Sequence, residues 1–374
     1  MHDAPTTQTP VRITLAHDYL LVMRGAERTF AAIADLYPLA PILTLLYDEP
    51  GTDGRFGGRA ITTSVLQRLG VGQAGFRRLL PLYPWATTRL PVPAGDVLLT
   101  SSSAFAHGLR APEGTVHVCY CHSPFRYAWH EQARALAEVP AILRPPLRCQ
   151  LSRIRRWDIA ASERVDHYVA NSRITRERVK AHYGREAPVV HPPVEISRFS
   201  PGTPGDALLV VSEIVAHKRI DVALEAARIT RTPIRIVGSG PAQAELSESY
   251  PEAEFLGRVD DQALAELYAG ARAVLVPATE EFGITAVEAQ AAGRPVIAAA
   301  AGGALETVLD GRTGRLAAPG DPGSFADAIE QVAQLDLDPA DAVRNAERFS
   351  VETFKQRLAD EVQAALERGP RARR

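Results

Sequence analysis

The chain has little of what secreted or membrane-spanning proteins depend on. Its 374 residues include three cysteines, Cys119, Cys121 and Cys149, an odd number with no paired spacing. We therefore predict reduced thiols and no disulfide framework. No run approaches the ~20 apolar residues of a membrane-spanning helix. Residues 1–10 lack the basic and apolar regions of a signal peptide. Together these absences predict a cytoplasmic protein without transmembrane segments.

Metal and dinucleotide signatures are also missing. No histidines, cysteines and aspartates have metal-ligand spacing, and no D-x-D follows a predicted strand, so we predict neither a metal ion nor a cofactor. The G-x-G-x-x-G fingerprint is absent, which argues against a dehydrogenase. The formal net charge is −2, so no overall field attracts the protein to nucleic acid.

Strand-like and helix-like patterns alternate along the chain, which predicts an α/β protein with doubly wound parallel sheets. The first half begins with a strand at 11–16, a glycine-bearing loop and a helix that ends near 34. A polar run rich in proline and glycine at 200–206 predicts a linker. Further strands are predicted at 96–100, 116–120, 166–170, 207–211, 234–238, 253–257, 273–276 and 295–298. Helices are predicted at about 219–229, 240–248, 261–269, 284–292, 322–334 and, after a break at 339–345, at 350–367. With 46% apolar residues the chain fills two cores. We predict one domain at 1–195 and another at 206–348.

The segment 280–288, EEFGITAVE, follows a predicted buried strand and carries two carboxylates eight residues apart. It predicts a turn, then a helix that begins near Gly283 and continues through Ala291. Unpaired amides and the helix dipole favour an anion at such a helix start. Glu280 before the turn and Glu288 on the helix can each accept hydrogen bonds from hydroxyls. An anion site between two hydroxyl acceptors predicts a nucleotide sugar as ligand. The alternative is that both glutamates are solvated surface residues.

Residues 274–316 resemble the donor site of retaining GT-B glycosyltransferases of family 4. The E-x7-E motif, the strand at 295–298 and the pair Gly302–Gly303 occur in the family's order. The resemblance implies two Rossmann-like domains that face a central cleft, with the helix at 350–367 returning to the N-terminal, acceptor-side domain. It implies metal-independent transfer of a hexose from a nucleoside diphosphate sugar, with retention of anomeric configuration. It also assigns the sugar hydroxyls to Glu280, the ribose to Glu288, and the phosphate or sugar to the amides of Gly283, Ile284 and Thr285.

Lys218 follows the predicted strand at 207–211 in the run SEIVAHKRI. Carboxyl ends of parallel strands face the ligand crevice, where a lysine offsets the charge of a departing diphosphate. Exposure to water at a helix start is the alternative. The run resembles the family's G-R-L-x-x-x-K-R/G motif, and Lys218 and Arg219 fall on its K-R pair.

Glu213 stands where the family has arginine in this motif. An acid beside a diphosphate is repulsive unless it is paired, swings away or meets a different group. Pairing with Arg219 or His217 would relieve that repulsion. Without it, Glu213 favours a non-catalytic partner protein of the same fold, and this function stays open.

His122 lies in the run CYCHSPFRYAW at 119–129. The run is similar to the H-x-P-x-R-Y-x-W sequence of bacterial O-antigen mannosyltransferases in the same family, with His130 in place of their aspartate. The resemblance places His122 beside the transferred sugar. It makes GDP-mannose the leading donor and polysaccharide biosynthesis the implied role. A hydrogen-bonded structural histidine is the alternative.

Two further segments resemble donor-binding turns of the family. Gly25–Ala26 resembles a glycine loop that reaches the donor diphosphate, with alanine in place of the second glycine. The turn GRVD at 257–260 resembles a strand-end turn whose backbone contacts the base. It assigns Arg258 and Val259 to the donor site, and a solvated Arg258 is the alternative.

Two basic segments bear on the acceptor. Residues 143–157 contain five arginines and no acid, and residues 76–85 mix basic, aromatic and aliphatic side chains. Both are suited to anionic lipid headgroups at the inner face of a membrane, with a saccharide, glycolipid or small molecule as acceptor. A solvated helix face and an ordinary buried loop are the alternatives. A nucleotide-sugar epimerase or phosphorylase of the same fold, which needs no saccharide acceptor, is a further possible function.

Overall fold

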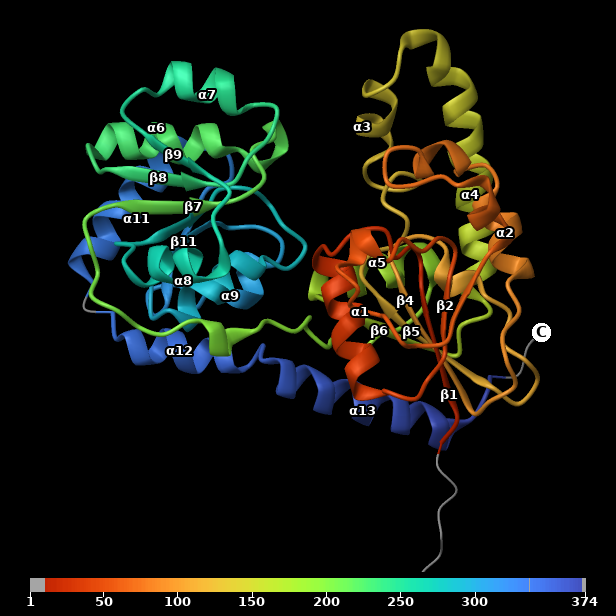
Figure 1. Ribbon diagram of the computed structural model, residues 1–374. Helices are drawn as coiled ribbons and strands as arrows, with labels where there is room; N and C mark the ends of the chain where they lie inside the picture. The colour runs from red at the N-terminus through yellow and green to blue at the C-terminus, as the bar shows by residue number, and fades with distance from the viewer. Residues whose placement is uncertain (1–10, 336, 372–374) are drawn as a thin grey trace, which may run out of the picture. The chain divides into compact units, whose positions relative to one another are not determined.

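The chain folds as two compact units in a computed structural model that describes residues 11–335 and 337–371 (Figure 1). The first unit contains the chain up to Asn171, Thr175–Val190 and the residues from Lys355 onward. The second contains Ser172–Ile174 and His191–Phe354. Residues 1–10, for which no signal peptide is predicted, lie outside the described residues. Within the described ranges, no helix combines the length and the apolar character that crossing a membrane requires.

A six-stranded parallel sheet forms the centre of the first unit, in the order β3-β2-β1-β4-β5-β6. Its strands are β1 (Ile13–His17), β2 (Ile42–Thr44), β3 (Ile61–Thr63), β4 (Val97–Ser102), β5 (Val116–Cys121) and β6 (His167–Ala170). Strands β1, β4, β5 and β6 lie where the sequence predicts them. The sequence-based prediction lacks β2 and β3, which have three residues each.

The helices that lie mainly in the first unit include the C-terminal one. They are α1 (Gly25–Leu36), α2 (Tyr83–Arg89), α3 (Gln132–Ala137), α4 (Arg144–Ser162), α5 (Arg173–Tyr183) and α13 (Val351–Arg368). Helix α13 contacts the first residue of β6, since Glu361 Oε2 lies 2.9 Å from His167 Nε2. This contact confirms that the C-terminal helix returns to the N-terminal part of the chain.

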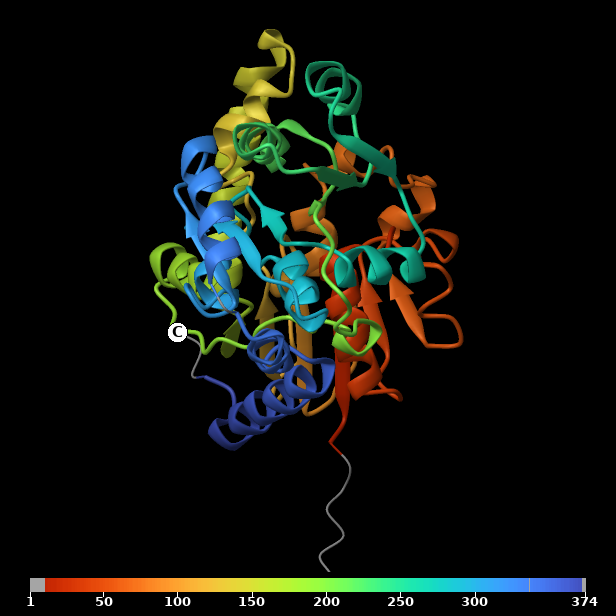
Figure 2. The ribbon, with the colours of Figure 1, turned by 90° about the vertical axis from the view of Figure 1, so that its left-hand side faces the viewer.

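The second unit is built on another six-stranded parallel sheet, in the order β12-β11-β10-β7-β8-β9. Its strands are β7 (Leu208–Val211), β8 (Ile234–Val237), β9 (Glu254–Gly257), β10 (Val274–Val276), β11 (Val296–Ala299) and β12 (Gly314–Ala317). Leu208 and Val210 pack against α6 (Ile220–Thr230) and α11 (Pro322–Gln334). Leu209 belongs to the opposite face, which α8 (Asp261–Ala269) and α9 (Ile284–Ala291) cover (Figure 2). Because the central strands β7, β10 and β11 are buried on both faces, their sequences are continuously apolar. These two sheets confirm the predicted α/β fold class.

Helix α12 (Pro339–Glu347) corrects the prediction of a break at 339–345. Asp338 caps this helix by accepting a hydrogen bond from Ala340 N at 2.8 Å. Pro339 occupies the first helical position, where its missing N–H costs nothing because that amide has no intrahelical partner. Asn345 Nδ2 then donates to Gln290 Oε1 of α9 at 2.6 Å. Proline disrupts a helix when it lies in the interior. Pro339 lies at the first position instead, so the helix begins there.

Candidate functional site

A small hollow opens at the carboxyl ends of β7 and β10 in the second unit. Its lining includes Ser212, Lys218, Pro277, Glu280 and Thr285. Lys218 Nζ donates a hydrogen bond to Glu280 Oε1 at 2.6 Å. Each of these two side chains is 26% exposed, so a ligand can reach both. This edge of a parallel sheet is where α/β proteins bind their ligands.

A tight turn after β7 positions Lys218 at this edge. Residues 216–218 form one turn of 3-10 helix, and Arg219 takes a left-handed conformation with φ of 51° before α6 begins. The Arg219 side chain donates to Asp221 in the first turn of α6, with Nε–Oδ1 and Nη2–Oδ2 distances of 3.2 Å and 3.1 Å. Arg219 is therefore paired with Asp221 and does not compensate for Glu213.

The pair Gly302–Gly303 holds the loop that carries Glu280. Gly303 N donates to Glu280 O at 2.8 Å. A Cβ atom would lie 2.1 Å from Glu280 O if built on Gly302, and 2.2 Å from Phe282 O if built on Gly303. Both distances are far below van der Waals contact, so only glycine permits this approach. The backbone of the Glu280 loop is thus fixed by two residues that follow the next strand, β11.

Helix α9 begins directly after this loop. Gly283, its N-terminal cap residue, has φ of 86°, a left-handed conformation that glycine adopts without strain. The first amides of a helix have no intrahelical acceptor, so those of Gly283, Ile284 and Thr285 are available to an anion. Thr285 Oγ1 lies 3.5 Å from Val211 O and brings this helix start to the end of β7.

Glu288, one turn further along α9, is held by a buried tyrosine. Tyr268 OH donates to Glu288 Oε2 at 2.8 Å. Burial, together with the Glu288 charge, raises the pKa of Tyr268 well above its ordinary value, so the hydroxyl remains a donor. A carboxylate has about four acceptor positions, so a carboxylate fixed in this way can also accept from a diol.

The loops after β7 and β8 pack backbone against backbone, and the turn after β9 contacts them through a side chain. A Cβ atom on Gly238 would lie 1.9 Å from Ser212 O, and one on Gly240 would lie 2.2 Å from Ile214 O. Arg258, in the turn after β9, donates from Nε to Ser239 Oγ at 3.1 Å. Val259 beside it is partly buried. The predicted residues Arg258 and Val259 therefore lie at the carboxyl edge of the same sheet as Lys218 and Glu280.

Glu213 is exposed on the loop after β7. Its backbone oxygen accepts from Val215 N at 3.0 Å. Its carboxylate makes no ion pair within residues 11–335 and 337–371. The negative charge that the sequence places in the lysine motif is consequently neither buried nor neutralised.

His122 lies in the first unit, at the carboxyl end of β5, and is 7% exposed. Ser101 Oγ sits between two histidines, 2.8 Å from His122 Nε2 and 3.1 Å from His17 Nδ1. His17 ends β1 and Ser101 belongs to β4, so three neighbouring strands bring these groups together. Gly25 and Ala26 begin α1 after the loop that follows β1. They too belong to the carboxyl edge of the first sheet.

Asp18 is an organising residue that the sequence does not reveal. It is 2% exposed and accepts hydrogen bonds from the backbone N–H groups of Ser103, Phe105 and Ala106 at 2.6–2.8 Å, and from Ser102 Oγ at 3.1 Å. Burial by itself raises the pKa of Asp18, but His17 and the backbone donors lower it below its ordinary value. Asp18 thus fixes the loop after β4 to the loop after β1. Its position directly after a strand-end histidine is its only local signal.

Asp158 is a second buried carboxylate that fixes neighbouring segments, here the run at 119–129 that contains His122. Trp129 Nε1 and Tyr183 OH both donate to its Oδ2 atom at 2.7 Å, and His107 Nε2 lies 3.3 Å from Oδ1. Burial raises the pKa of Asp158 above its ordinary value, against the opposing effects of His107 and the two donors. The tryptophan of the 119–129 run is thereby tied to α4 and α5.

Glu306 lies just after the glycine pair and anchors two segments at the boundary of the second unit. Its Oε1 accepts from Arg173 N at 2.8 Å, and its Oε2 lies 2.9 Å from His191 Nε2. The residue is 7% exposed. Glu306 thereby holds residues 173 and 191, which lie more than 100 positions earlier in the sequence.

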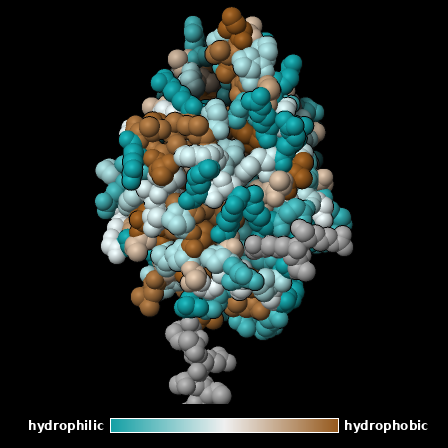
Figure 3. All heavy atoms as spheres, turned by 90° about the vertical axis from the view of Figure 1, so that its right-hand side faces the viewer, coloured by the Kyte–Doolittle hydropathy of each residue, from teal (hydrophilic) through white to brown (hydrophobic). Residues whose placement is uncertain are grey.

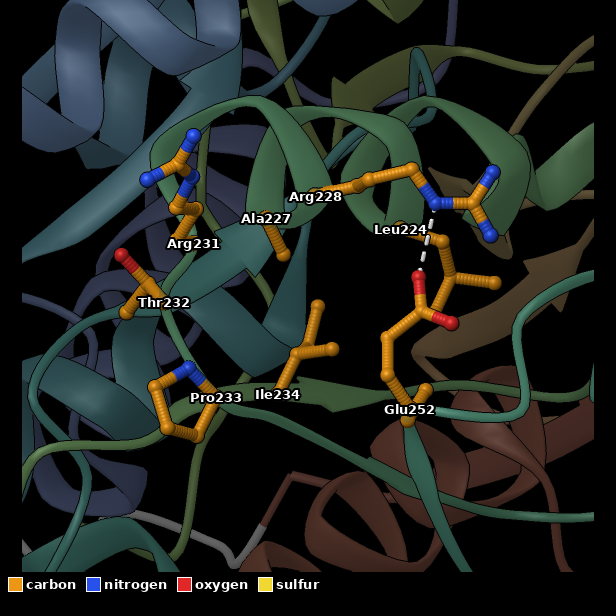
Figure 4. A pocket seen from close by; sticks show the side chains of 9 residues that line it. Leu224, Ala227, Arg228, Arg231, Thr232, Pro233, Ile234 and Glu252 are labelled. Atoms are coloured by element: carbon orange, nitrogen blue, oxygen red, sulfur yellow. Dashed lines mark hydrogen bonds and ion pairs between the residues drawn. The ribbon is translucent and has the colours of Figure 1, made fainter.

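A larger hollow of about 570 Å³ lies elsewhere in the second unit (Figure 4). Its lining includes Leu224, Arg231, Ile234 and Glu252, and Arg228 Nε donates to Glu252 Oε1 at 2.7 Å. This hollow lies at the amino end of β8, opposite the edge that carries Lys218. The smaller hollow is therefore the candidate ligand site. No cluster of three or more metal-ligating side chains occurs among the residues that the structure describes.

Two glycosyltransferase families match the chain. Residues 46–198 match the family described as Glycosyltransferase Family 4, and residues 205–334 match the family described as Glycosyl transferases group 1. The second match contains Lys218, Glu280 and Glu288. The first contains His122.

Curated relatives and solved structures agree with these matches. The chain is 34% identical over 242 residues to D-inositol 3-phosphate glycosyltransferase 2 of Catenulispora acidiphila, covering 54% of this chain and 57% of the relative. It is 36% identical over 239 residues to D-inositol 3-phosphate glycosyltransferase of Geodermatophilus obscurus, covering 54% and 53%. The chain therefore spans little more than half the length of these relatives.

Two solved structures cover nearly the whole chain at low identity. Anabaena Alr3699/HepE in complex with UDP has a TM-score of 0.70 at 18% identity, covering 94% of this chain and 100% of that one. Sucrose-phosphate synthase from Thermosynechococcus elongatus has a TM-score of 0.71 at 18% identity, covering 94% and 98%. The likeness confirms the predicted GT-B fold.

Proposed function

We propose that this chain, which belongs to glycosyltransferase family 4, transfers a hexose from a nucleoside diphosphate sugar to a saccharide, glycolipid or small-molecule acceptor. The anomeric configuration is retained and no metal ion takes part. The observation that carries the proposal is the pair of Lys218 and Glu280 at the start of α9. It combines a cation, a hydroxyl acceptor and helix amides at the ligand-binding edge of the sheet.

The donor diphosphate replaces Glu280 as the partner of Lys218. The helix amides of Gly283, Ile284 and Thr285 face its phosphate oxygens, so ammonium and helix dipole together offset its charge. Glu280, released from Lys218, accepts hydrogen bonds from the hydroxyls of the sugar. Donor binding thus exchanges one ion pair for a charge-neutralised diphosphate and a positioned sugar.

The reaction is a displacement on one face of the sugar. The acceptor oxygen forms a bond to the anomeric carbon as the bond from that carbon to the diphosphate oxygen breaks. The departing phosphate oxygen takes the proton of the acceptor hydroxyl, so no side chain acts as a covalent nucleophile. The protein contributes position and charge neutralisation.

The remaining predicted residues take supporting roles. Glu288, fixed by Tyr268, binds the ribose, and the turn with Arg258 and Val259 binds the base. Arg219, Glu213 and the Gly25–Ala26 loop lie near the diphosphate. His122, oriented by Ser101, contacts the transferred sugar. We propose that the reaction takes place in the cytoplasm. Cys119, Cys121 and Cys149 are free thiols, as expected in that reducing compartment.

GDP-mannose is our leading donor. The support is the likeness of the 119–129 run to bacterial O-antigen mannosyltransferases. UDP-sugars compete, because HepE has been crystallised with UDP and with UDP-glucose. D-inositol 3-phosphate, which the names of the relatives contain, enters as an acceptor to be tried.

A thermal-shift screen against GDP-, UDP-, dTDP- and ADP-sugars tests the proposal. A donor at a hundred times its dissociation constant stabilises the protein by about 2.7 kcal/mol. Stabilisation by one nucleotide series, followed by sugar transfer to an acceptor, supports a glycosyltransferase. Release of free nucleotide or sugar phosphate in the absence of an acceptor would indicate an epimerase or phosphorylase instead.

A non-catalytic partner protein is the second candidate, because the Glu213 carboxylate is unneutralised. In that case no nucleotide sugar stabilises the protein. The same screen therefore separates the two functions.

A further inference from the structure

Two stretches of the first unit contain arginine but no acidic residue. Residues 61–95 carry four arginines, residues 139–157 carry five, and neither contains aspartate or glutamate. The stretches come together because α2 and α4 pack into one hydrophobic core, through Tyr83 and Ala86 of α2 and Leu151 and Ile154 of α4. We call the exposed residues of these two stretches the α2–α4 face.

The arginines of the α2–α4 face are directed to solvent. Arg148, Arg153 and Arg156 of α4 are exposed, and none of them makes an ion pair within the described part of the chain. Arg148 and Arg156 are eight residues apart and so lie on the same side of the helix. On α2, the Arg89 guanidinium lies over the Trp85 ring at 4.8 Å, a contact that leaves its charge in place. The face is therefore positive without internal compensation.

Apolar side chains are exposed beside these arginines. Ile142 is 83% exposed and Leu143 is 51% exposed, in the turn that leads into α4. The N-terminal half of α4 projects beyond the sheet of the unit (Figure 1). Figure 3 shows hydrophobic residues at the projecting tip, next to hydrophilic ones. Trp85 on α2 is 44% exposed. Singly scattered exposed apolar residues are normal on a protein surface. Here two aliphatic side chains lie together in one turn next to arginines, which is typical of an interaction site.

A lipid surface fits this combination better than other anionic partners. Nucleic acids and acidic proteins are recognised largely through charge, which the arginines alone supply. Exposed isoleucine and leucine gain free energy when they enter the acyl boundary of a bilayer. Tryptophan is enriched at the headgroup level, and arginine stems extend from there toward phosphate. The aliphatic tip suits the acyl chains of a bilayer leaflet, the tryptophan suits the headgroup level, and the arginines suit the lipid phosphates.

We propose that the α2–α4 face docks the first unit onto an anionic phospholipid bilayer. Ile142 and Leu143 insert below the headgroups, and Arg148, Arg153 and Arg156 contact lipid phosphates. The docking is independent of sugar transfer. If the proposed function also holds, docking gives the enzyme access to a lipid-linked acceptor.

Vesicle flotation with the full chain tests this surface. The protein is expected to float with vesicles of phosphatidylcholine mixed with phosphatidylglycerol, much less with phosphatidylcholine alone, and to be released by salt. Two double variants, Ile142→Asp/Leu143→Asp and Arg148→Glu/Arg156→Glu, should each lower the partition coefficient about tenfold or more. All four positions are exposed, so unchanged melting temperatures are expected and would show that the fold is intact.

The matched control is Arg176→Glu/Arg357→Glu, which changes the charge equally at exposed arginines outside the two stretches. This variant should bind vesicles like the wild type. Equal binding to neutral and anionic vesicles, or an equal loss in the control, would overturn the proposal. So would full binding by the aspartate variant together with equally tight binding of single-stranded RNA, since that result describes a general polyanion site.

The same variants separate this proposal from the proposed function. Their stabilisation by a nucleotide sugar should equal that of the wild type. If the wild-type protein binds the nucleotide sugar but does not bind vesicles, the docking surface alone is rejected. Vesicle binding without any donor binding rejects the enzymatic function alone.

Discussion

Lys218 and Glu280 are 62 residues apart in the sequence, yet Lys218 Nζ and Glu280 Oε1 lie 2.6 Å apart at the end of the second sheet. Each charge neutralises the other, and both side chains remain accessible. A ligand that supplies a diphosphate and hydroxyls can satisfy both partners at once, which an anion alone or a neutral sugar alone cannot do. This relationship explains why the site should favour a complete nucleotide sugar.

Removing either partner should reduce turnover strongly. We expect Lys218→Ala and Glu280→Ala each to lower kcat/KM about a hundredfold or more, the usual cost of losing an electrostatic contact to the transition state. Lys218→Ala should also weaken donor binding in calorimetry. Lys355→Ala, a lysine on α13, is the control and should retain activity. Wild-type rates in the Lys218 variant would remove that residue from the mechanism.

Gly303→Ala should disturb the site through the backbone alone. Gly303 has φ of −66°, so alanine is conformationally acceptable there, but its Cβ would lie 2.2 Å from Phe282 O. The Glu280 loop must shift, at a cost of about 1–3 kcal/mol in the free energy of unfolding. Donor binding should weaken as well.

The matched control for this prediction is Gly323→Ala, where the nearest atom to a new Cβ is an aspartate side-chain oxygen at 3.3 Å. Thermal unfolding and donor titration of both variants provide the measurement. If both variants unfold and bind the donor alike, the close approach of the glycine pair to the Glu280 loop is not needed for stability or donor binding.

Asp18→Asn should destabilise the first unit and change its pH dependence. An asparagine oxygen cannot replace both carboxylate oxygens toward the donors of residues 102–106, so a loss on the order of 3 kcal/mol is expected. The pKa of Asp18 is lowered in the folded state. Its contribution is thus present above the unfolded pKa and is lost as the pH falls through the folded one. Unfolding free energies measured from neutral to acidic pH should converge for variant and wild type at low pH. A constant difference at all pH values would contradict this account.

The elements of the second unit could largely be predicted from the sequence, but the site contacts could not. Strand β10 has only three residues, but it lies in an apolar run at 273–278 because both of its faces are buried, and the helix after Gly283 has a clear start. The contact of Lys218 with Glu280 depends on β7 lying beside β10, a pairing of strands that are not consecutive. No local pattern encodes it. Asp18 is hidden for the same reason, since its donors lie more than 80 residues away.

The α12 region shows the opposite limit. Its proline and asparagine were sufficient to suggest a break, because both residues disfavour helix interiors. Their positions relative to the cap Asp338 decide the outcome, since Pro339 comes first and Asn345 binds Gln290 of α9. A tertiary contact therefore overrides a local preference.

Changes at His122 should separate chemistry from donor binding. If His122 contacts the transferred sugar, His122→Ala should lower kcat about a hundredfold and leave the dissociation constant of the free nucleotide nearly unchanged. Ser101→Ala removes the group 2.8 Å from His122 Nε2. It should cause a smaller loss, about tenfold, and Ser101→Thr should restore part of it. If His122→Ala lowers the melting temperature and leaves the kcat of the folded fraction intact, His122 is a structural residue.

Glu213 offers the sharpest test of catalytic competence. Its carboxylate is exposed and unneutralised on the loop after β7, in the motif that carries Lys218. If it lies near the bound diphosphate, it opposes binding by Coulomb repulsion, and Glu213→Gln should tighten the donor about threefold to tenfold. Glu213→Arg adds a cation and should tighten it further, with the gain shrinking as salt rises. Titration of both variants with one nucleotide sugar at two salt concentrations measures the effect. Weaker binding by Glu213→Gln would show instead that the carboxylate accepts a hydrogen bond from the donor, and the departure from the family's arginine would then be a determinant of specificity.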